Sequence, residues 1–153
     1  IKAGRPLPGV LGVYCAGLGA QFGGDSQHFG EYAVTNVAAA SARSAAPADA
    51  APANPAPQVG YFTGIDMNQF IVNPTVDETL LARCPPTIFF TATRDFAMSG
   101  AALSHWKLLK AGVDSDLMVF EGLYHGFMTN PDFPESQDGY RIAARFFDKH
   151  LGR

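Results

Sequence analysis

Hydrophobic positions along the chain alternate between short uninterrupted runs and helical spacing, and this alternation predicts a mixed α/β fold. Residues 9–16 form a short apolar run between Pro8 and Gly17, as expected of a strand that is buried on both faces. Two further strands are predicted at residues 86–93, which are rich in Thr, Ile and Phe, and at residues 116–121.

Helices are predicted between and after these strands. A short helix is expected at residues 77–83, a longer one at 98–111 and a final one at 135–151. The 3–4 spacing of the second helix is carried by Leu103, Trp106, Leu109 and Lys110, with Gly112 as its stop signal. The core face of the last is expected to be Ile142, Ala143, Phe146, Phe147 and Leu151, followed by Gly152. Strands and helices that alternate at these lengths imply parallel strands with right-handed crossovers.

The region between the first strand and these later elements is less regular. Residues 17–30 contain five glycines, which is typical of a loop, and a weak helix is expected at 31–43. Residues 44–58 hold four prolines, many alanines and no large apolar side chain. Such a tract cannot form a core, so we expect an exposed, mobile Ala/Pro-rich excursion within one domain, or alternatively part of a lid over a pocket.

Composition narrows the possible classes of function. The 153 residues are 47% hydrophobic and 16% charged, which suits one globular domain with a real core. A net charge of −3 does not favour a nucleic-acid partner, and no apolar run is long enough to span a membrane. No signal peptide is visible, so a cytoplasmic location is expected. Cys15 and Cys84 are too few for a disulfide framework and are predicted to be two separate buried thiols.

Two of the predicted strands end on a titratable residue. Asp95 follows the strand at 86–93, and His125 follows the strand at 116–121. In open α/β sheets, chemistry gathers at the carboxyl ends of the strands. A histidine can take the proton of a serine hydroxyl near neutral pH, and a carboxylate on its far ring nitrogen fixes the tautomer. The pattern therefore predicts the acid and the base of a Ser-His-Asp relay, whereas each residue alone could be a helix cap or a backbone-bonded loop residue.

The remaining candidates are weaker. His105 and His150 lie within predicted helices and are expected to be structural. His28 is close to Asp25 and Ser26, but these three residues are too near one another in sequence to form a triad, and a surface role is expected. The run Gly17-Leu18-Gly19-Ala20-Gln21-Phe22-Gly23 follows a strand, which is a weak sign of dinucleotide binding. A second strand ending in an acid should follow about 20 residues later, and the Ala/Pro-rich tract stands there instead.

Several stretches resemble the bacterial branch of the hormone-sensitive-lipase family, which are esterases of the α/β-hydrolase fold. The most specific is the loop Tyr124-His125-Gly126-Phe127 after the run Leu117–Gly122. The others are Leu7–Gly12, Gly60–Asp66, Pro85–Asp95 and Ala111-Gly112-Val113. The acid before the histidine is also the order of an α/β-hydrolase triad. Where the family often has Asp-Pro-Leu, this chain has Asp95-Phe96-Ala97.

The resemblance implies that the chain is the C-terminal part of an α/β-hydrolase sheet, with about three parallel strands and flanking helices. It implies a carboxylic ester hydrolase with Asp95 as triad acid, His125 as triad base, no cofactor and no metal. Phe96, Gly126 and Phe127 become candidate substrate contacts, for esters of short or medium acyl chains. No Gly-x-Ser-x-Gly occurs in the sequence.

Because the sequence lacks the nucleophilic-serine motif, a partner is expected to supply the serine. We expect a second polypeptide to carry the N-terminal half of the sheet, the serine and the oxyanion hole, because a half-sheet would expose an unpaired edge. This chain alone should then be inactive, and the assembled enzyme could be a homo-oligomer. The alternative function is a non-catalytic binding module of the same fold. Retention of both Asp95 and His125 argues against it, because binding alone would not require both.

Overall fold

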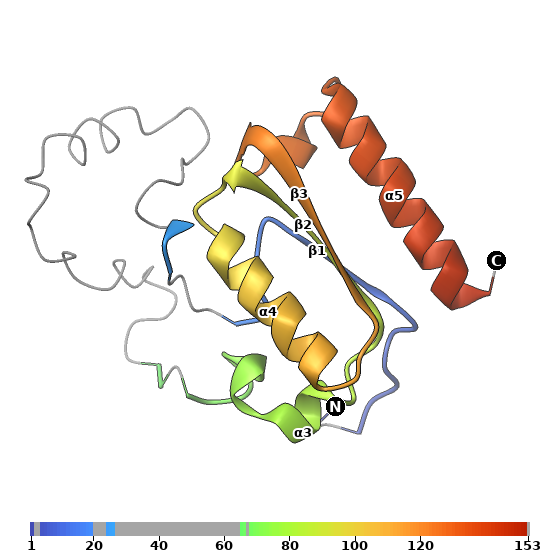
Figure 1. Cartoon of the computed structure of the whole chain (residues 1–153). Coiled ribbons are helices and arrows are strands. Elements are labelled where there is room, and N and C mark those ends of the chain that lie inside the picture. Colours follow the sequence, from blue (N-terminus) through green and yellow to red (C-terminus); the bar gives the residue numbers. More distant parts are fainter. Residues whose placement is uncertain (2–3, 20–23, 27–64, 67, 153) are drawn as a thin grey trace, which may run out of the picture.

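A computed structural model of the chain describes residues 1, 4–19, 24–26, 65–66 and 68–152. Its centre is a three-stranded parallel sheet in the order β1-β2-β3 (Figure 1). The strands are β1 (Leu11–Tyr14), β2 (Thr87–Arg94) and β3 (Ser115–Tyr124). The parallel sheet and the three strand positions confirm the predicted α/β class, and β3 runs further toward its C-terminal end than predicted.

Helices lie on both faces of this sheet. On one face are α3 (Glu78–Leu81) and α4 (Met98–Lys110), and on the other is α5 (Pro134–Leu151), with one-turn helices η2 (Pro74–Val76) and η3 (Phe127–Thr129) between the elements (Figure 1). The ends follow local chemistry. The Asp77 carboxylate caps α3 by accepting from two backbone N–H groups, Pro134 begins α5, and Gly152 ends it in the left-handed conformation.

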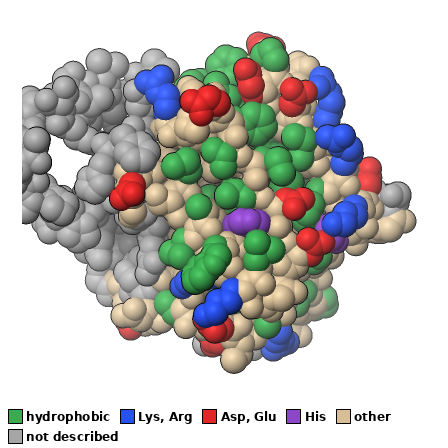
Figure 2. Space-filling model, viewed as in Figure 1, with side chains coloured by type: hydrophobic (Ala, Val, Ile, Leu, Met, Phe, Trp, Pro, Cys, Tyr) green, Lys and Arg blue, Asp and Glu red, His purple; other side chains and the backbone are tan. Residues whose placement is uncertain are grey.

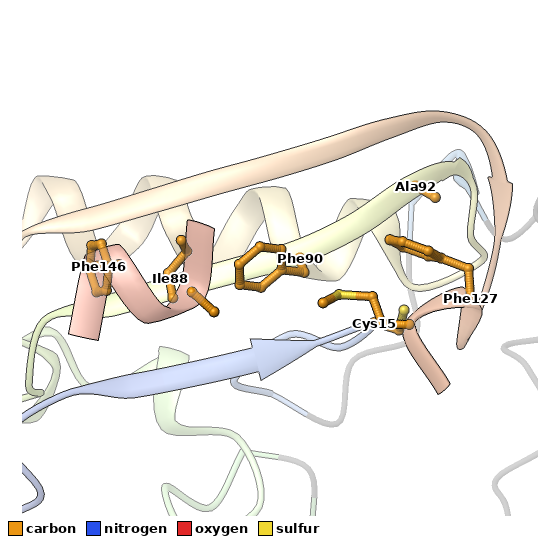
Figure 3. Close-up of a cluster of buried hydrophobic side chains, with 8 residues drawn as sticks. Cys15, Ile88, Phe90, Ala92, Phe127 and Phe146 are labelled. Atoms are coloured by element: carbon orange, nitrogen blue, oxygen red, sulfur yellow. The ribbon is translucent and has the colours of Figure 1, made fainter. Parts of the chain in front are cut away.

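The central strand β2 is buried on both faces because its side chains alternate between two cores. Ile88, Phe90 and Ala92 face one cluster together with Ala143 and Phe146 of α5 (Figure 3). The neighbouring Phe89 faces the opposite cluster, which contains Leu81, Ala101, Leu108 and Val113. A strand covered by helices on both sides is therefore continuous in its hydrophobic character, as the sequence of 86–93 indicated.

One expectation about burial is corrected. The strand β1 is only partly buried, and Tyr14 is 44% exposed, because within the described residues β1 lies at the edge of the sheet and pairs with β2 alone. The apolar residues of α4 at 3–4 spacing, Leu103, Trp106 and Leu109, are also exposed. Figure 2 shows hydrophobic side chains over the face that carries this helix.

Helix α4 instead turns Ala101, Ser104 and Leu108 toward the sheet, and these three residues are buried. The small side chains of Ala101 and Ser104 let the helix approach closely, and the Leu18 N–H donates to the Ser104 hydroxyl at 2.9 Å.

We expect Leu108→Ala to lower the free energy of unfolding by about 2–5 kcal/mol, because it leaves a cavity. The control Leu103→Ala should change it by less than about 0.5 kcal/mol in the same denaturant titration. An equal loss for Leu103 would show that the exposed face is covered in the protein.

Several expectations lie outside the described residues: the helix at 31–43, the Ala/Pro-rich excursion at 44–58, and His28.

Among the helices that the structure describes, none combines the length and the apolar character needed to cross a membrane.

Candidate active site

The ends of β2 and β3 bring the two predicted residues together. The register pairs Ala92 with Phe120 and Arg94 with Tyr124, so β3 carries two extra residues between these pairs. The bulge contains Gly122, which has a positive φ of 74° and whose N–H donates to the Thr93 hydroxyl at 2.8 Å. Because Arg94 and Tyr124 are neighbours across the sheet, the next residue of each strand, Asp95 and His125, emerges at the same place.

The side chains of Asp95 and His125 are in direct contact. His125 Nδ1 lies 2.8 Å from Asp95 Oδ1, the Asp95 side chain is fully buried, and the His125 side chain is 33% exposed. A carboxylate on Nδ1 keeps the proton on that nitrogen, so that Nε2, the ring nitrogen remote from Asp95, carries the lone pair of a base. The arrangement has the geometry that the acid and the base of a nucleophilic relay require.

The Asp95 carboxylate is held as an anion by donors from its own neighbourhood. The Thr91 hydroxyl donates to Oδ2, and the Ala97 N–H donates to Oδ1, each at 2.8 Å. Burial alone would raise the pKa of Asp95, but the hydrogen bond from His125 and those from Ala97 and Thr91 outweigh it and lower the pKa below its ordinary value of 3.8. A depressed pKa means that the carboxylate stabilises the fold above its unfolded-state pKa, a contribution lost as the pH falls through the folded value.

The three candidate substrate contacts occupy different places. Phe96 is 7% exposed, and its ring centroid lies 4.3 Å from that of His125. Gly126 has a φ of 79°, which allows the chain to turn directly after His125 into η3. Phe127 is fully buried in the core (Figure 3), and its ring packs against Phe120. Its ring therefore lies beneath the loop in this structure, and its role as a substrate contact stays a prediction.

Sequence reasoning missed Cys15, the residue that follows β1. It is 6% exposed, and its Sγ accepts the Gly126 N–H at 3.1 Å. Burial raises the pKa of Cys15 to about 12, so that the thiol is protonated at neutral pH. A ligand atom of Cys15 lies within 4.8 Å of those of Asp95 and His125, a donor set that could hold a metal ion by residue type. Asp95 and His125 are already hydrogen-bonded to each other, and the Asp95 carboxylate and the Cys15 thiol each accept a backbone N–H, which favours a hydrogen-bond network over a metal site.

Ser26 holds the segment that follows Asp95. Its hydroxyl is fully buried, donates to the Phe96 carbonyl at 2.8 Å and accepts the Ser99 N–H at 2.9 Å. The Ser26 N–H in turn donates to the Ser99 hydroxyl. These contacts occupy the Ser26 side chain structurally, in agreement with the doubt about a local triad.

The other described histidines lie apart from the site. His105 Nδ1 is 2.9 Å from the Ser115 hydroxyl, and burial lowers the pKa of this histidine. His150 Nε2 is 3.3 Å from Asp114 Oδ2 in the last turn of α5. A surface hollow lined by 68–71 and 76–78 shares no residue with the Asp95–His125 pair.

The sequence and the fold of this chain are similar to those of known proteins. The model of the alpha/beta hydrolase fold family matches residues 32–129. None of the curated protein sequences matches the chain.

Solved structures of esterases share the fold. A crystal structure of an esterase is 24% identical, with a TM-score of 0.68 over 97% of this chain and 42% of its own. An esterase from the bacterial hormone-sensitive lipase family is 18% identical, with a TM-score of 0.70 over 98% of this chain and 46% of its own. Carboxyl esterase 2 from the mycorrhizal fungus Tuber melanosporum is 16% identical, with a TM-score of 0.68, and the coverages are 97% and 46%. The chain thus spans less than half the length of these structures.

Proposed function

Because the chain belongs to the alpha/beta hydrolase fold family, we propose that it is the part of a carboxylic ester hydrolase that supplies the Asp and His of a Ser-His-Asp triad. The observation that carries this proposal is the 2.8 Å contact between His125 Nδ1 and the buried Asp95 carboxylate at the carboxyl ends of two adjacent parallel strands. A contact of this kind is needed for relay chemistry and has no evident use in simple binding, so it favours an enzyme over a binding module.

In the proposed reaction, a serine hydroxyl attacks the ester carbonyl carbon while its proton passes to Nε2 of His125. Asp95 stabilises the imidazolium that forms. The tetrahedral intermediate collapses, the bond from carbonyl carbon to the alcohol oxygen breaks, and His125 returns the proton to the leaving alkoxide. Water, activated by the same nitrogen, then hydrolyses the acyl-enzyme to acid and free serine.

The serine and the backbone N–H groups of the oxyanion hole are proposed to come from outside these 153 residues, on a second polypeptide with the N-terminal half of the sheet. Two observations support a serine outside these residues: the sequence holds no Gly-x-Ser-x-Gly, and it covers 42–46% of the esterase structures described above. The substrate is proposed to be an ester of short or medium acyl chain. This ester would approach His125, whose ring lies beside that of Phe96. A cytoplasmic location and a homo-oligomeric assembly remain predictions.

A phosphonylating probe for nucleophilic serines tests the proposal on the intact protein that contains this chain. We expect the probe to abolish hydrolysis of p-nitrophenyl butyrate in proportion to labelling. Peptide mass mapping should place the label on a serine outside residues 1–153. Labelling of Ser26 or Ser99, or hydrolysis that survives complete labelling, would contradict the proposed division of the triad.

A further inference from the structure

Cys15 lies at the edge of the sheet where the carboxyl ends of β1, β2 and β3 are side by side. It directly follows β1, and its N–H donates to the Phe90 carbonyl of β2 at 2.7 Å. Its φ is 51°, in the left-handed region that residues with a Cβ adopt at some energetic expense. A non-glycine residue is retained in such a conformation when its surroundings determine it strongly, and this is common near functional sites.

The thiol of Cys15 connects the two halves of the relay. Its Sγ accepts the N–H of Gly126, the residue directly after His125 and 111 positions away in sequence. On another side the Cys15 Sγ lies within 4.8 Å of an oxygen of the Asp95 carboxylate. The rest of its environment is apolar: Cys15 lies at the end of the core cluster near Phe127 (Figure 3).

A direct chemical role for this thiol does not fit its surroundings. The side chain is 6% exposed, and a thiol whose pKa is raised to about 12 by burial is not a nucleophile at neutral pH. What the geometry does offer is a fixed spacer. A group that accepts the Gly126 N–H and lies within 4.8 Å of the Asp95 carboxylate sets how far the His125 loop lies from the acid.

We propose that Cys15 is a positioning residue of the relay, which holds the Gly126 backbone against the Asp95 carboxylate so that the His125–Asp95 hydrogen bond keeps its geometry. Removing the thiol leaves the Gly126 N–H without its acceptor and opens space beneath the loop. The imidazole then moves relative to the carboxylate, and displacements of about 1 Å near a reacting group lower rates by up to about 100-fold.

The test uses two variants that remove the thiol, Cys15→Ala and Cys15→Gly, in the intact protein. Glycine accepts the positive φ without strain, so this variant keeps the test valid if the alanine variant folds poorly. Cys15→Ser returns an acceptor for the Gly126 N–H. Cys84→Ala is the matched control, because this second thiol lies outside the site beside the Leu80 carbonyl.

Two measurements separate positioning from mere stability. In ester hydrolysis we expect Cys15→Ala and Cys15→Gly to lower kcat by about 10- to 100-fold with KM changed less than about twofold. In proton NMR we expect faster exchange of the His125 Nδ1 proton with solvent. Cys15→Ser should recover most of both properties, and Cys84→Ala should match the unmodified protein.

The kinetic measurement depends on the proposed ester hydrolysis, whereas the NMR measurement does not. A protein that hydrolyses no ester but shows the exchange difference would refute the proposed function and support the role of Cys15. An unchanged Nδ1 proton in folded Cys15→Ala or Cys15→Gly would overturn the role of Cys15, as would a loss in the serine variant as large as that in the alanine variant.

Discussion

Replacing His125 with alanine is expected to lower ester turnover of the intact protein by about 10⁴- to 10⁶-fold, because triad members act as a unit and the serine loses its base. The fold should survive the change. The His125 side chain is one-third exposed, and the loop is also held by the Gly126 N–H bond to Cys15 and by the buried Phe127 ring. The measurement is kcat/KM for a short p-nitrophenyl ester, together with the melting temperature.

His105→Ala is the control for this experiment. That histidine lies on α4 and contacts Ser115, so its loss can affect stability but should leave turnover within about twofold at temperatures where the variant is folded. Near-normal turnover in His125→Ala would contradict the assignment of the base. An equal loss of activity in both variants would point to a general effect on folding.

The candidate pair could be predicted from the sequence because it depends on local patterns. Hydrophobic runs mark β2 and β3, and the chain order then places Asp95 and His125 at the carboxyl ends of parallel strands. What the pattern could not give is the register. The bulge at Gly122 sets how far β3 extends relative to β2. The glycine within the predicted strand was the feature of the sequence that indicated this bulge.

Other features escaped prediction because they depend on packing between distant segments. Helix α4 presents Leu103, Trp106 and Leu109 at helical spacing, yet the face that packs against the sheet is the one with Ala101, Ser104 and Leu108. Hydrophobic periodicity indicates that a helix has an apolar face. It does not indicate which face packs against the sheet when two faces are suitable. Cys15 was likewise treated as an ordinary buried thiol, since nothing local shows that residue 126 reaches it from 111 positions away.

Replacing Asp95 with asparagine is expected to lower turnover by about 10³- to 10⁴-fold, although the side chain barely changes in size. Two orientations of the amide are possible, and each removes something that the relay needs. If the amide oxygen stays on the Ala97 N–H, it still accepts the Nδ1 proton of His125 but carries no charge to stabilise the imidazolium. If the amide turns over, its NH₂ donates to Nδ1 and forces the ring proton onto Nε2, so the base is lost.

Proton NMR separates the two orientations, because the Nδ1 proton of His125 persists in the first and is absent in the second. The variant also loses a carboxylate whose pKa is depressed in the fold, so its melting temperature should fall more at pH 7 than at a pH below the folded-state pKa of Asp95. Asp114→Asn is the matched control, since that half-exposed acid contacts Lys149 and His150 far along α5. Turnover of Asp95→Asn close to that of Asp114→Asn would remove Asp95 from the mechanism and leave the 2.8 Å contact as a structural hydrogen bond.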